Sequence, residues 1–142
     1  MNRIDAFKNE LANYTYYTKY MQKLEDKLDM LNYEMRGVKG IRYDKTPGTP
    51  NMKAIETRKL YLSNEIEKVE AEISRITLSI MHIENILSSM ENIAIRKAII
   101  DVYIKNETIL KICSDYNLSG PGLHYQMNKC IEQALNEVEK AE

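Results

Sequence analysis

The chain has few of the residues that break helices. Its 142 residues include only three prolines and five glycines, and the bulky aromatics are rare too, with no tryptophan and one phenylalanine. With so few helix breakers and with 29% charged residues, the composition predicts an all-α protein. Long apolar runs are absent as well: no stretch approaches the roughly 18 apolar residues of a membrane span, and no apolar signal segment opens the chain. We therefore expect a cytosolic protein with no membrane partner.

Cysteine and histidine are also scarce, with two of each. Cys113 and Cys130 lie seventeen positions apart, and neither His82 nor His124 stands beside them at the spacing of zinc ligands. We expect both cysteines to be small buried hydrophobic residues, and we predict no metal site and no cofactor. The sequence also offers no nucleophile paired with a base and no glycine-rich phosphate loop. It therefore predicts no enzyme and no small-molecule substrate.

What the chain does have is two long rows of apolar residues, spaced alternately by three and four. The second row is interrupted only by Lys59 and consists of Ile55, Leu62, Ile66, Val69, Ile73, Ile76, Ile80, Ile83, Leu87 and Met90. A helix of about 36 residues with this pattern is about 54 Å long and must bury its apolar stripe against another helix. The first row runs from Ile4 to Met35, with an extra step of three between Tyr14 and Tyr17. We expect altered packing or a distortion of the supercoil near that step.

The two rows predict helices over about 2–36 and 53–88, joined by a loop over 37–51 that holds three glycines and two prolines. Asn2 is the expected N-cap of the first helix, and Gly37 its expected end. Because the helices match in length, we expect residues 1–90 to form a long antiparallel helical hairpin, a coiled coil, as the simplest arrangement; a bundle formed between chains is equally compatible with the two rows. Two helices alone bury little, so we expect either a homodimer or a C-terminal unit folded back on the hairpin.

The pattern changes after Ser88, where three short amphipathic stretches follow one another and define a second domain over 91–142. Thr108 is the expected N-cap of the middle helix. Asn117-Leu118-Ser119 is a tight connection to the last helix, with Ser119 as its N-cap. Two helices joined by a three-residue turn give the outline of a helix-turn-helix. In that outline Cys113 is the small residue over which the second helix crosses, and Leu118, Leu123 and Cys130 face the core.

The segments 91–104, 108–113 and 117–119 resemble the helix-turn-helix of region 4 of bacterial sigma factors. The loop Gly-Val-Lys-Gly-Ile-Arg-Tyr-Asp-Lys-Thr-Pro-Gly at 37–48 and the order of the helices resemble small phage and prophage regulators of the ArpU and RinA type. This resemblance implies control of transcription of phage late or packaging genes, in the cytoplasm of a Gram-positive host. The implied partner is double-stranded DNA, with RNA polymerase or another protein as a second partner.

Carried onto this sequence, the resemblance implies that the exposed side of the last helix reads the bases. The expected DNA-binding residues are Ser119, His124, Tyr125, Gln126, Asn128 and Lys129. Contacts to phosphate or to a protein partner are expected from Lys39, Arg42, Lys45, Arg96, Lys97 and Lys111.

Two features depart from this pattern. Gly120-Pro121-Gly122 occupies the start of the expected recognition helix, where two side chains are missing and where each glycine in a helix interior would cost about 1 kcal/mol. Residues 91–142 also carry six basic and eight acidic groups, although DNA affinity comes largely from basic groups. The alternative is a non-enzymatic helical interaction protein that binds and modulates a host or phage protein through its coiled coil and a repurposed helix-turn-helix.

Overall fold

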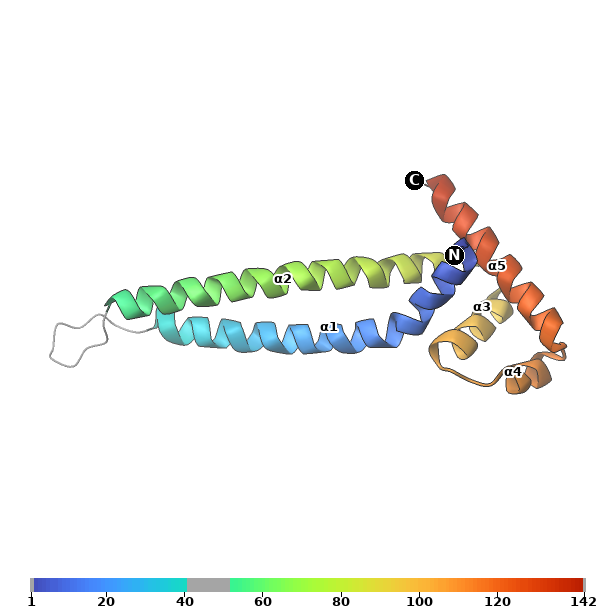
Figure 1. Cartoon of the computed structure of the whole chain (residues 1–142), viewed down its shortest axis with the longest axis horizontal. Coiled ribbons are helices and arrows are strands. Elements are labelled where there is room, and N and C mark those ends of the chain that lie inside the picture. Colours follow the sequence, from blue (N-terminus) through green and yellow to red (C-terminus); the bar gives the residue numbers. More distant parts are fainter. Residues whose placement is uncertain (1, 41–51, 142) are drawn as a thin grey trace. The chain divides into compact units, whose positions relative to one another are not determined.

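The computed structural model describes residues 2–40 and 52–141, and every regular element among them is helical (Figure 1). The elements in chain order are α1 (Arg3–Lys39), α2 (Met52–Ser88), α3 (Ile93–Ile99), the π-helical turn η1 (Ile100–Ile104), α4 (Ile109–Tyr116) and α5 (Gly120–Ala141). The prediction of an all-α protein is confirmed. None of the helices in the described ranges is long and apolar enough to cross a membrane.

The chain divides into two compact units. The first, here called the terminal unit, comprises Met1–Thr18 and Leu78–Glu142, and the second, the hairpin unit, comprises Lys19–Thr77. The predicted division at residue 90 differs from these units, because the last three helices share a core with the ends of α1 and α2. The break after Thr18 follows directly on the extra step of three between Tyr14 and Tyr17 in the apolar row.

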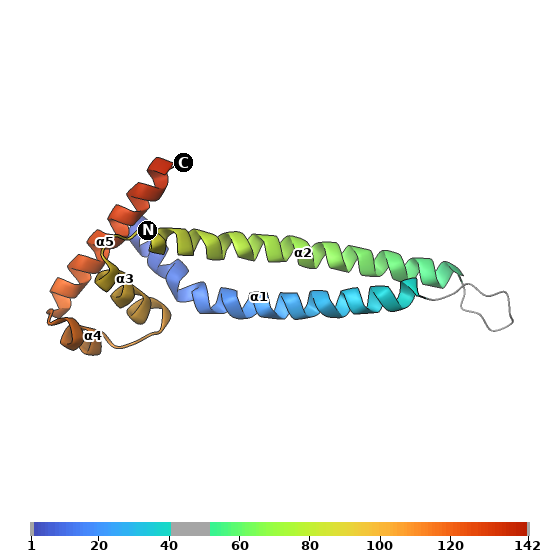
Figure 2. The same ribbon diagram turned by 180° about the vertical axis from the view of Figure 1, so that it is seen from behind.

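In the hairpin unit, α1 and α2 run antiparallel and side by side, as both views show (Figures 1 and 2). Two polar pairs fix their register: Arg58 donates to Glu34 at 2.6 Å, and the Tyr20 hydroxyl donates to Glu72 at 3.4 Å. The two residue numbers total 92 in both pairs, as an antiparallel pair requires. The antiparallel pairing predicted from the two apolar rows is therefore present.

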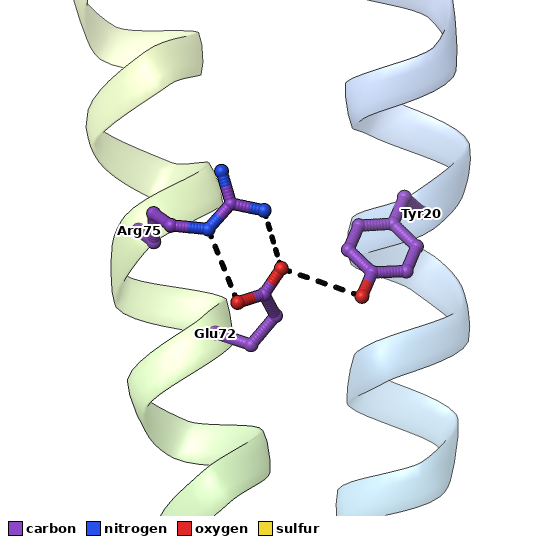
Figure 3. Close-up of polar contacts among 3 residues, drawn as sticks. All are labelled: Tyr20, Glu72 and Arg75. Atoms are coloured by element: carbon purple, nitrogen blue, oxygen red, sulfur yellow. Dashed lines mark hydrogen bonds and ion pairs between the residues drawn. The ribbon is translucent and has the colours of Figure 1, made fainter.

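The Tyr20–Glu72 contact belongs to a small polar cluster on the side of the helix pair (Figure 3). Arg75, one turn along α2, donates from Nε to Glu72 Oε2 at 3.1 Å and from Nη2 to Oε1. Hydrogen bonding from Arg75 is the main reason why the pKa of Glu72 lies below its usual value. The carboxylate that holds Tyr20 is therefore kept ionised by a neighbour on its own helix.

The apolar seam of α2 is buried unevenly. Every seventh residue is buried, namely Ile55, Leu62, Val69 and Ile76, whereas Ile66 and Ile73 are half-buried. This is expected where two helices pack alone, because the second seam position of each heptad lies toward the open side of the pair. On α2, the buried core of the hairpin unit is thus a single row with one fully buried apolar residue in each heptad.

The start of α1 was predicted correctly from the sequence, but its end was not. Asn2 is the N-cap as predicted, since its Oδ1 accepts from the Asp5 N–H at 2.8 Å. The end predicted at Gly37 is wrong: the helix continues to Lys39, and the Gly40 N–H still donates to the Arg36 carbonyl at 3.0 Å. A glycine ends a helix only where the backbone turns left-handed, and inside a helix it costs only about 1 kcal/mol.

The terminal unit is built around one core to which all its helices contribute. Its buried residues are Phe7 and Leu11 of α1, Ile83, Ile86 and Leu87 of α2, Met90 after it, and Ile95, Ala98, Ile99, Ile112, Leu123, Met127, Cys130, Ile131 and Ala134 of α3 to α5. Arg3 near the start of α1 bonds Asn136 at 3.2 Å and Glu139 at 3.0 Å, both on α5. Of the two expected ways to cover the helical hairpin, a folded-back C-terminal segment is therefore present within this unit.

The first C-terminal helical stretch changes its form along its length. Asn92 caps α3 by accepting the Ile95 N–H at 3.1 Å. The helix then widens into η1 and ends where Asn106 takes a left-handed conformation with φ 59°. The Glu107 N–H closes this end by donating to the Asp101 carbonyl at 2.8 Å. The spacing of apolar residues gave no sign of the wider turn.

Candidate nucleic-acid interface

The connection from α4 to α5 is the most sharply defined local feature of the terminal unit. Thr108 caps α4, its Oγ1 accepting the Lys111 N–H at 3.3 Å. At the other end of α4, Asn117 is left-handed with φ 54° and ψ 41°, and its N–H donates to the Cys113 carbonyl. The Leu118 N–H donates to the same carbonyl at 3.0 Å. The roles predicted for Thr108 and Asn117 are confirmed.

Ser119 starts α5 and is its N-cap, as predicted. Its Oγ accepts the Gly122 N–H at 3.1 Å, and its carbonyl accepts the Leu123 N–H at 2.8 Å. Gly120, Pro121 and Gly122 therefore lie in the first turn, where Pro is well tolerated because the first N–H groups have no partner within the helix. A Cβ at Gly122 would lie 2.9 Å from Ser119 Oγ. Glycine at this position leaves room for the cap.

This geometry makes Ser119 and Gly122 energetically coupled. We expect Ser119→Ala to lower the free energy of unfolding by about 1 kcal/mol through loss of the cap. Gly122→Ala should be close to neutral, because its Cβ displaces the serine hydroxyl while alanine favours the helix by up to about 1 kcal/mol. When Gly122 is already alanine the cap is already lost, so adding Ser119→Ala should lower the free energy of unfolding by almost nothing more. Urea denaturation of the four proteins measures this, and strictly additive effects would contradict it.

The inner face of α5 packs into the core of the terminal unit. Leu123, Met127 and Cys130 are buried there, as predicted for Leu123 and Cys130, whereas Cys113 is only half-buried. Burial raises the pKa of the Cys130 thiol, and the nearby positive charge of Arg96 offsets this in part. Cys130 therefore stays protonated at neutral pH and acts as a small apolar residue.

The residues expected to read DNA divide into two groups. Ser119, His124, Tyr125 and Lys129 are exposed, and Tyr125 and Lys129 lie one turn apart on the same side of α5. Gln126 and Asn128 are half-buried. The Asn128 Oδ1 atom is itself buried and has no hydrogen-bond partner, so a base edge can reach it only after the side chain rotates.

The expected phosphate contacts are more scattered. Arg96 is half-buried and its Nη2 donates to the Met90 carbonyl at 2.6 Å, a role in joining α3 to the end of α2 that the sequence did not reveal. Lys111 forms an ion pair with Glu107 at 3.4 Å, and Lys97 is exposed. Lys39 belongs to the hairpin unit. Arg42 and Lys45 lie outside the described residues.

The acidic residues of the C-terminal segment are unevenly distributed along α5. From Gly120 to Ile131 the helix carries Lys129 and no acidic residue, whereas Glu132, Glu137 and Glu139 follow in its second half. Arg3 of α1 pairs with Glu139 at 3.0 Å. Within α5 the acidic groups therefore lie away from its start, and one of them is balanced by a residue far away in the sequence.

Two large apolar side chains also face solvent here. Leu110 near the start of α4 is 84% exposed and Tyr125 is 63% exposed. Leu110 was missed as a surface residue, although the spacing of Ile109, Ile112, Cys113 and Tyr116 already leaves it off their shared face.

Comparison of the chain with protein-family models, with curated proteins and with solved structures found no match. Within residues 2–40 and 52–141, no group of three or more histidine, cysteine, aspartate or glutamate side chains is placed to hold a metal ion.

Proposed function

We propose that this chain is a non-enzymatic, DNA-binding regulator of transcription of the phage or prophage type, acting in the cytoplasm of a bacterial host. In this proposal α4 and α5 form a helix-turn-helix, with α5 as the recognition helix. The observation that supports it best is the connection between them, where a left-handed Asn117 is followed by the Ser119 cap within three residues. Such a tight turn is what this class of motif requires.

The exposed side of α5 would supply the contacts to DNA. Lys129 can bind a phosphate or a guanine edge, and His124 and Tyr125 can donate hydrogen bonds to base edges. The absence of acidic residues from Gly120 to Ile131 supports this, because carboxylates there would repel the phosphates.

Fluorescence anisotropy on duplexes from upstream of the chain's own operon, with a scrambled duplex for comparison, tests the proposal. Lys129→Ala should weaken binding to all duplexes about 3- to 10-fold and reduce the slope of log affinity against log salt by about 1. Tyr125→Ala should instead reduce the preference for the upstream duplex. Lys140→Ala, an exposed lysine at the far end of the same helix, is the matched control and should change neither quantity.

Absent binding, or equally weak binding to both duplexes with no effect of Lys129→Ala, would contradict the proposal. The second candidate is then a protein-binding module, and the exposure of Leu110 and Tyr125 favours it. A Leu110→Gln variant separates the two, because it adds no charge and should leave DNA binding nearly unchanged, but it removes the apolar side chain that a protein partner would bury on this face.

A further inference from the structure

The outward side of α2 is unusually poor in charge. From Thr57 to Ser88 its outermost positions, spaced by three and four, are all exposed, and Glu67 is the only charged residue among them; Lys53, one turn earlier, carries a further charge at the start of the helix. This outer line of α2 consists of Thr57, Leu60, Asn64, Glu67, Ala71, Ser74, Leu78, Met81, Asn85 and Ser88. Three of its members are large apolar residues, with Leu60 63%, Leu78 68% and Met81 49% exposed. A helix face that meets only water normally carries many more charges.

The partner helix provides the comparison. On α1, the outward positions of the hairpin unit are Lys19, Gln22, Asp26, Asp29, Tyr33 and Arg36, and four of these six are charged. The two helices have similar lengths and pack against each other in the same way. The lack of charge is therefore specific to α2.

The charges of α2 are sorted on the two sides of its outer line. One flank carries Tyr61, Lys68, Arg75 and His82, and the other carries Glu56, Ser63, Glu70, Thr77 and Glu84, each series repeating every seven residues. The first flank has no acidic residue and the second no basic one. Lys68 and Arg75 pair with carboxylates of their own helix, yet their side chains remain 74% and 62% exposed, so a second molecule can reach them.

We propose that the outer line of α2 binds the same line of a second copy of this chain, with the two α2 helices parallel. In a parallel pair related by a two-fold axis, each flank of one helix faces the opposite flank of the other. Lys68 and Arg75 of one copy then face Glu70 of the second copy, and Lys68 and Arg75 of the second copy face Glu70 of the first. In an antiparallel pair each flank would meet its own kind, placing basic against basic and acidic against acidic groups. The sorting of charge therefore selects a second copy in the parallel orientation.

The inferred dimer leaves the buried seam untouched, because Ile55, Leu62, Val69 and Ile76 are already covered within one chain. A parallel pair also brings the C-terminal ends of the two α2 helices together, and α3 follows each of them within five residues. The inference goes beyond the proposed function and does not rest on it, since self-association is measured without DNA.

Sedimentation equilibrium of the full chain over a range of concentrations tests the dimer. The wild type should reach twice the monomer mass, and Leu78→Glu combined with Met81→Glu should weaken association by about 100-fold or more, because each dimer loses four buried apolar side chains. Tyr33→Glu, a 71% exposed apolar residue on the outward side of α1, is the control and should leave association unchanged. Circular dichroism confirms that the variants remain helical. A wild type that stays monomeric at every concentration would overturn the inference and leave the face for a different protein.

Spin labels test the orientation. Ser88→Cys is labelled in a Cys113→Ser, Cys130→Ala chain that retains the wild-type helix content and self-association, and the distance between the two labels is measured by pulsed electron resonance. A parallel pair should place the labels within about 20 Å of each other, given the usual separation of packed helices. In an antiparallel pair centred on the outer line they would lie more than about 40 Å apart, and that result would overturn the parallel arrangement. Labels at Thr57→Cys, near the N-terminal end of α2, should likewise lie within about 20 Å of each other in a parallel pair.

Discussion

Leu123→Ala is expected to lower the free energy of unfolding of the terminal unit by about 2–5 kcal/mol. Leu123 is fully buried in the core shared by the five α-helices, and it is the residue whose N–H closes the first turn of α5 on the Ser119 carbonyl. Alanine would leave a cavity directly beneath the start of α5, and the surrounding helices can fill it only in part. Urea denaturation followed by circular dichroism measures the loss.

The matched control for Leu123→Ala is Leu110→Ala, because Leu110 is 84% exposed and lies on the neighbouring helix. Its stability should stay within about 0.5 kcal/mol of the wild type. Equal effects of the two substitutions would mean that the start of α5 is not packed as described. If α5 reads DNA, Leu123→Ala should also weaken DNA binding, since the exposed residues after Ser119 depend on this anchor.

Leu62→Ala should have an effect of the same size, about 2–5 kcal/mol, but in the hairpin unit. Leu62 is fully buried and is one of the residues that recur every seven positions along the seam. Only one residue in each heptad of α2 is fully buried there, so no further buried side chains can fill the space that Leu62 leaves. Hydrogen exchange should show faster exchange of amides in residues 19–39 and 52–77, with a smaller change in residues 93–141.

Leu60→Ala is the control for this second prediction. Leu60 lies two positions from Leu62 but is 63% exposed on the opposite side of α2. In dilute protein it should change hydrogen exchange very little. A uniform increase of exchange over the whole chain in Leu62→Ala would contradict the division into two compact units, because it would show that they unfold together.

The helices and their caps were predictable because local chemistry decides them. The spacing of apolar residues defined the long helices, and Asn2, Thr108 and Ser119 cap through side-chain oxygens that bond N–H groups three residues later. The end of α1 was mispredicted because a glycine permits a left-handed turn but does not impose one. The division into compact units depends on which segments share a core, and no local pattern encodes that.

For the candidate site, too, the sequence predicted the features that local spacing decides and not the contacts that depend on the fold. Helical periodicity places Tyr125 and Lys129 opposite Leu123 and Met127, with His124 at the edge of the buried face, and the structure has the first two and His124 exposed and Leu123 and Met127 buried. The inward oxygen of Asn128 depends on its rotamer, and the bond from Arg96 to Met90 depends on the path of the chain between two helices. The pairing of Arg3 with Glu139 joins residues more than a hundred positions apart. Contacts of these kinds are outside the reach of spacing arguments.

The register of the hairpin unit, in which paired residue numbers total 92, has a further consequence. A seam that repeats every seven residues would match itself again if one helix slid by one heptad, so apolar contacts alone do not choose between the alignments. The polar pairs do choose. Sliding one heptad in one direction would replace Glu34 by Lys27 opposite Arg58, setting two positive charges against each other. A few polar side chains beside the seam, worth little in total stability, thus disfavour an alignment that the buried residues would accept.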